Sequence, residues 1–161
     1  MWMPAIVAAL FTLSGADSAP AMLGNRDFIV TRDRTPGYWA ATTAEAVEAK
    51  AAVVAFLATP HPKMLRRNEE GRQKIMASFG TYYLLFQGVS MLSAAGGAVT
   101  PDPGGERNVL VRGFCRIDPK WLKAVRKGWP LTVFDGGPCF FDAYYDLATK
   151  RVWLFDVHGI G

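Results

Sequence analysis

Two short runs near the end of the chain, both rich in aromatic residues, constrain the fold most strongly. These runs, residues 139–145 and 151–157, flank five turn-forming residues at 146–150. Two strand-prone runs at this separation predict an antiparallel β-hairpin. One face of such a hairpin must be covered, so the preceding part of the chain has to supply a covering layer.

A helix is predicted for residues 42–58, in the first half of the chain. Thr42 stands three residues before Glu45, which is the spacing of a capping box. In that arrangement the two side chains satisfy backbone N–H groups that the first turn leaves without partners. The helix is expected to end before Pro60, because proline cannot donate the next backbone hydrogen bond.

A second helix is predicted to begin near Asn68 and to continue to about residue 93. Glu69 and Glu70 follow Asn68 and suit the positive end of a helix dipole. Five large apolar residues then follow at spacings of four, three, four and three positions, which draws one stripe along a helix. They are Ile75, Phe79, Tyr82, Phe86 and Val89. Residues 81–86 also have a strand-prone composition, which leaves that alternative open.

The second half of the chain is predicted to be mainly β, and residues 100–106 form a loop between the two halves. Residues 108–116 and 131–134 are strand-like. Between them, Asp118 precedes Pro119, which places an N-cap residue before proline at the first helical position. This short helix is expected to bury Trp121, Leu122 and Val125.

The predicted fold class is therefore α+β. It consists of two N-terminal helices packed on a small antiparallel sheet of three to five strands, with a C-terminal β-hairpin and one short inserted helix. The length of 161 residues fits one domain, and a hydrophobic fraction of 50% can supply a core. The expected domain spans residues 22–161.

The first 21 residues are predicted to be a cleaved signal peptide. An uncharged apolar run at 5–13 is followed by small residues, among which 19–21 supply the Ala-Pro-Ala pattern that a signal peptidase accepts. The run is far shorter than a spanning helix, which needs about 20 residues, so no membrane span is expected after cleavage. The expected location is periplasmic or secreted. A buried N-terminal helix is the alternative, because no lysine or arginine precedes the run.

The charge of the chain argues against one class of partner. Lysine and arginine number 18 against 14 acidic residues, for a net charge of +4, and the basic residues are scattered along the sequence. A nucleic-acid binder is expected to gather its basic residues into a dense stripe within a recognisable module. A nucleic acid is therefore not expected as a partner.

Cys115 and Cys139 are the only cysteines, and they are predicted to form a disulfide. An even number of cysteines in an exported protein favours such a bond. Two small buried hydrophobic residues are the alternative. No metal site is expected, because neither cysteine has a second ligand at suitable spacing and the only histidines are His61 and His158. No cofactor is expected either.

Three ionisable residues near the end of the chain form the candidate catalytic set. Asp142 and Asp156 would lie on neighbouring strands of the hairpin, and His158 follows Asp156 by two positions. A carboxylate beside an imidazole can support general acid–base chemistry. No nucleophile motif, phosphate-binding glycine loop or pair of metal ligands accompanies them. A small hydrolase or ligand-binding domain is therefore the alternative function.

The aromatic residues of the hairpin support the leading functional hypothesis. They fall on both faces, only one of which can meet the helices, and an exposed aromatic patch often marks an interface. The candidate binding residues are Phe140, Asp142, Tyr144, Trp153 and Phe155. We therefore expect a small exported, non-enzymatic protein-binding module, of which an inhibitor or an immunity-like protein is one form.

Overall fold

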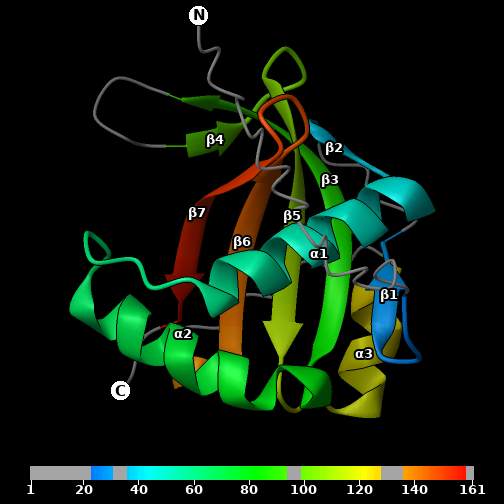
Figure 1. Cartoon of the computed structure of the whole chain (residues 1–161). Coiled ribbons are helices and arrows are strands. Elements are labelled where there is room, and N and C mark those ends of the chain that lie inside the picture. Colours follow the sequence, from blue (N-terminus) through cyan, green and yellow to red (C-terminus); the bar gives the residue numbers. More distant parts are fainter. Residues whose placement is uncertain (1–22, 31–35, 94–98, 128–135, 159–161) are drawn as a thin grey trace, which may run out of the picture.

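The computed structural model describes residues 23–30, 36–93, 99–127 and 136–158. They form a seven-stranded sheet with three α-helices and two short 3-10 helices, so the predicted α+β class is confirmed (Figure 1). The predicted signal peptide at 1–21 and the predicted strand at 131–134 lie outside the described residues. Within the described ranges, no helix is both long enough and apolar enough to cross a membrane.

The sheet is mixed, and it has more strands than the three to five antiparallel ones expected. Its main path is β1–β3–β5–β6–β7, while β2 and β4 also pair with β3. β1 runs parallel to β3, and the remaining pairs are antiparallel. Three of the strands, β1, β2 and β4, are two or three residues long, too short for alternation to reveal them. The strands are β1 (Asp27–Ile29), β2 (Tyr38–Trp39), β3 (Tyr83–Ser93), β4 (Val99–Pro101), β5 (Glu106–Phe114), β6 (Phe140–Asp146) and β7 (Arg151–Val157).

Two helices, α1 (Thr43–Ala58) and α2 (Arg66–Ser78), lie across one face of the sheet (Figure 1). The predicted capping box is present at the start of α1: the Thr42 hydroxyl accepts from the Glu45 amide at 3.2 Å, and the Thr42 amide donates to Glu45 at 2.8 Å. Between helices and sheet lies the main core. It includes Val53, Leu57, Ile75, Leu84, Phe86, Val109, Val111, Phe141, Ala143, Tyr145, Phe155 and Val157.

The predicted second helix was wrong beyond residue 78. α2 ends at Ser78, the 3-10 helix η1 (Phe79–Thr81) follows, and residues 83–93 are the long strand β3. This strand is covered on both faces: Phe86 packs in the main core and Leu85 in a second cluster on the other side. A strand buried on both faces reads as a continuous apolar run without alternation, and such a run also satisfies helical spacing.

The third helix, α3 (Pro119–Val125), packs on the opposite side of the sheet and does not bury all that was predicted. Asp118 caps it by accepting from the Lys120 amide at 2.7 Å. Val125 is buried against a cluster that includes Phe114. Trp121 is instead 57% exposed, because a helix of seven residues turns only a narrow stripe toward its support.

A disulfide joins the end of β5 to the beginning of β6. Cys115 follows β5, and Cys139 closes the 3-10 helix η2 (Gly137–Cys139) that leads into β6. Their Cα atoms are 4.8 Å apart, and the Cys115 amide donates to the Cys139 carbonyl at 2.9 Å. The bond therefore reinforces strand pairing that the backbone already makes.

Candidate binding site

The sheet face turned away from α1 and α2, here called the outer face, carries the polar and aromatic side chains of β5, β6 and β7. Val109, Val111, Phe141 and Ala143 face the helices, so the residues that alternate with them point outward. The strand register sets these outer residues in rows. Arg112 lies opposite Asp142, which lies opposite Asp156, and Leu110 lies opposite Tyr144 in the next row.

Asp142 is the centre of a charged network on this face. Its two carboxylate oxygens accept from Arg112 Nε at 2.8 Å and from the terminal Arg112 nitrogen Nη2 at 3.1 Å. His158 Nε2 lies 3.3 Å from the same carboxylate. Burial alone would raise the pKa of Asp142, but the bonds from His158 and Arg112 outweigh it, so that the pKa is lowered. The carboxylate is therefore held charged at neutral pH.

The same network keeps Arg112 charged. Its burial disfavours the guanidinium, but the hydrogen bonds and charge of Asp142 outweigh that effect and raise the pKa of Arg112. A carboxylate already bound by both arms of a guanidinium polarises a neighbouring imidazole less than an unpaired one would. The geometry therefore suits a fixed polar anchor better than a proton-transfer pair.

Tyr144 stands beside this network and is a poor proton donor. Burial, with a further contribution from the charge of Asp142, raises the pKa of Tyr144 to about 12. A general acid works best with a pKa near the ambient pH. Tyr144 instead packs against Trp153, with ring centroids 6.0 Å apart.

Trp153 is exposed and yet firmly oriented. Its side chain is 42% exposed, while the indole Nε1 donates to Asn108 Oδ1 at 2.7 Å. Asn108 is only 1% exposed, and its Nδ2 donates to the Glu106 carbonyl at 2.9 Å. The pairing of β6 with β7 shifts between Tyr144 and Tyr145, opposite Trp153. This irregularity and the Asn108 bond together place the indole on the outer face.

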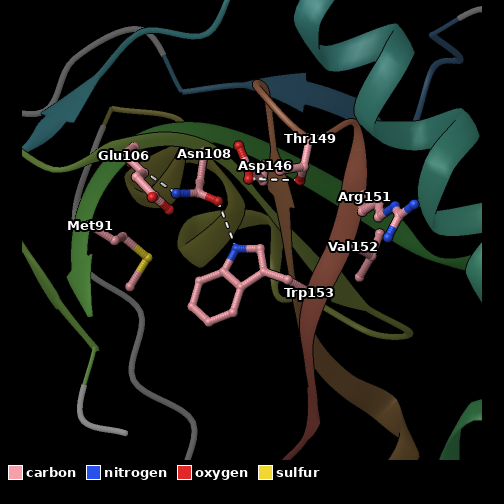
Figure 2. Close-up of a pocket in the computed structure, with 8 residues that line it drawn as sticks. All are labelled: Met91, Glu106, Asn108, Asp146, Thr149, Arg151, Val152 and Trp153. Atoms are coloured by element: carbon pink, nitrogen blue, oxygen red, sulfur yellow. Dashed lines mark hydrogen bonds between the residues drawn. The ribbon is translucent and has the colours of Figure 1, made fainter. Parts of the chain in front are cut away.

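An open hollow of about 400 Å³ lies beside Trp153. Figure 2 shows Met91 reaching toward the indole from the opposite wall, with Asn108 and Asp146 above the indole and Glu106 above Met91. The Arg151 side chain is directed away from the Trp153 ring (Figure 2). The hollow thus has apolar walls and two nearby carboxylates.

The structure brings some of the predicted site residues together and separates others. Asp142 and Tyr144 share the outer face with Trp153, and Asp142 meets His158. Asp156 lies opposite Asp142 as expected, but its ion pair is with Arg67 of α2, at 3.6 Å. Phe155 lies in the main core at 6% exposure, and Phe140 packs edge-on against Phe114 at 5.6 Å.

Several residues of this face were not singled out from the sequence: Met91, Glu106, Asn108, Arg112 and Asp146. Arg112 had a usable signal, because it interrupts the apolar run from Val109 to Phe114. A charge inside a strand that is otherwise buried requires a partner on a neighbouring strand. Asn108 had no such signal, since a single amide at the start of a strand is common.

Comparison with models of protein families, with curated proteins and with solved structures found no match to this chain. Among the described residues, no group of three or more histidine, cysteine, aspartate or glutamate side chains could hold a metal ion.

Proposed function

We propose that this chain is an exported, non-enzymatic module that binds another protein through the outer face around Trp153. The observation that carries this proposal is an exposed tryptophan whose orientation is set by a buried asparagine. Tryptophan is enriched among the residues that dominate binding energy, and a side chain ordered in advance loses little entropy on binding. An inhibitor or an immunity-like protein is the form we favour.

The export part of the proposal is supported by the disulfide between Cys115 and Cys139. Disulfides persist in oxidising compartments and are rare in the cytosol. We infer that residues 1–21 are removed as a signal peptide, leaving a domain of residues 22–161. Amino-terminal sequencing of protein recovered from outside the cytoplasm tests this: a start near residue 22 is expected, and an intact Met1 contradicts it.

A small hydrolase or ligand-binding domain is the second candidate, and the contact between His158 and Asp142 favours it. Asp156 would complete that set, but its ion pair with Arg67 draws it toward α2. The bidentate bond from Arg112 also compensates the negative charge of the Asp142 carboxylate. We therefore rank this candidate below protein binding.

Capture of a partner from an envelope extract tests the proposed function. Immobilised wild-type protein is expected to retain a stoichiometric, saturable partner, and Trp153→Ala should weaken that binding by at least about 2 kcal/mol, as for a hot-spot residue. Trp121→Ala is the matched control, because Trp121 is a similarly exposed tryptophan on α3. Absence of a saturable partner, or equal losses in the two variants, would contradict the proposal.

A further inference from the structure

We propose that the hollow beside Trp153 receives an arginine side chain of the partner protein. This inference rests on the proposed protein-binding function and adds the chemistry of the group that is bound. The hollow has the volume of a small ligand pocket, about 400 Å³. Its lining fits a flat cation.

The charge around the hollow is negative. Glu106 is exposed, and within the described part of the chain no ion pair involves it. Burial alone would raise the pKa of Asp146, but bonds from the Thr149 hydroxyl and the Ala148 amide outweigh it and lower the pKa. Asp146 is therefore charged at neutral pH. Arg151, the one basic residue of the lining, points away from the indole (Figure 2).

The aromatic wall of the hollow has an open place for a cation. Elsewhere in the described part of the chain, three aromatic rings are covered by arginines. Arg107 lies 4.0 Å from the Trp39 ring centre, Arg126 4.6 Å from that of Phe28, and Arg26 5.3 Å from that of Tyr83. Over the Trp153 ring, no arginine or lysine of the described residues lies at such a distance. Tryptophan is the aromatic side chain that attracts cations most strongly.

Arginine fits this lining better than lysine does. A guanidinium is planar and can stack on an indole while its N–H groups bond to carboxylates in the plane. Asn108 fixes the indole through the 2.7 Å bond to Nε1, so the stacking surface is ready before the ligand arrives. An ammonium group would gain the charge attraction but not the stacking.

A titration followed by NMR tests the inference without requiring the natural partner. The probes are N-acetyl-arginine amide and its uncharged counterpart N-acetyl-citrulline amide, and the readout is the Trp153 indole N–H signal, assigned with Trp153→Phe. The arginine probe should shift this signal saturably and bind at least about fivefold more tightly than the citrulline probe. Glu106→Gln should weaken arginine binding by about fivefold. The control Glu70→Gln, on the exposed surface of α2, should leave it unchanged.

Equal binding of both probes, an unshifted Trp153 signal, or no effect of Glu106→Gln would each overturn the inference. The two proposals fail separately. Partner capture that depends on Trp153 without arginine binding would remove this inference and leave protein binding standing. Arginine binding without any captured partner would contradict protein binding and leave only a site for the guanidinium group.

Discussion

Asp142 shows how a single charged residue can be tolerated on a largely covered sheet. Its side chain is 12% exposed and that of Arg112 is 24% exposed, so both charges have lost most of their water. The bidentate contact replaces that hydration, and His158 adds a further contact. Removing one member leaves the other charge without compensation, which costs more than the pair contributes.

Asp142→Asn is expected to lower the free energy of unfolding by about 2 to 3 kcal/mol at neutral pH. This is somewhat less than for a fully buried pair, because Arg112 keeps some contact with water. The lowered pKa of Asp142 means that its contribution is complete above the ordinary value of 3.8 and is lost as the pH falls through the folded-state pKa. Denaturant unfolding of both proteins should therefore give curves that converge in acid.

Asp156→Asn is the control for this prediction. Asp156 lies in the same row, but its side chain is 47% exposed and its arginine partner 59% exposed. Such surface pairs contribute little, so a change below about 0.5 kcal/mol is expected. Curves for wild type and Asp142→Asn that stay parallel at low pH would contradict the role given to Asp142.

At the scale of elements, the edge strand β7 is protected by a side chain of α2. β7 is the last strand of the sheet path, so one side of it has no neighbouring strand among the residues that the structure describes. Asn68 occupies part of that side: its Nδ2 donates to the Phe155 carbonyl at 3.2 Å, and its Oδ1 accepts from the Val157 amide at 3.4 Å. The amide thus makes the two bonds that another strand would make, and it blocks edge-to-edge pairing.

Asn68→Ala is expected to destabilise the protein by about 2 kcal/mol, because it leaves a buried carbonyl and a buried amide without partners. It should also make the protein self-associate as its concentration rises, since the β7 edge becomes open. Denaturant unfolding and sedimentation velocity measure the two effects. Gln73→Ala, on the exposed side of the same helix, is the control. Unchanged stability and a monomer at all concentrations would refute the capping role.

At the scale of the whole molecule, the disulfide closes a segment of the chain that contacts both sides of the sheet. The two cysteines are 24 positions apart, and α3 lies between them. The same segment meets the helical side as well, because the Tyr82 hydroxyl donates to the Pro138 carbonyl at 2.5 Å. One covalent bond therefore ties together parts of the molecule that pack on opposite faces.

Reduction of this disulfide is expected to lower the free energy of unfolding by about 3 kcal/mol, mainly by releasing the unfolded chain from a closed loop. Urea unfolding with and without a reductant measures the difference. The double variant Cys115→Ser, Cys139→Ser should have the stability of the reduced protein and should not respond to the reductant. If the reductant did not change the free energy of unfolding of the wild-type protein, the main structural support for export would be lost.

Part of the fold and of the candidate site could be predicted from the sequence, and there are physical reasons why the rest could not. Asp142 and Asp156 were correctly expected to be neighbours. Trp153 and Phe155 are two positions apart and would share one face of a regular strand, so the sequence did not predict that Trp153 points outward and Phe155 inward. The shift in pairing next to Tyr145 places them on different faces. A change of one residue in register reverses the faces of a strand.

Local sequence was sufficient to predict that α1 begins after its N-cap residue Thr42 and α3 after its N-cap residue Asp118. This is possible because the hydrogen bonds of a helix cap are made within three residues. Long-range pairing decided the rest. Residues 83–93 became a strand because neighbours on both sides supplied its backbone partners. Arg112 found Asp142 at a separation of 30 positions, and Trp153 found Asn108 at 45. Contacts at such separations depend on where the whole chain folds back on itself, which no short window of sequence contains.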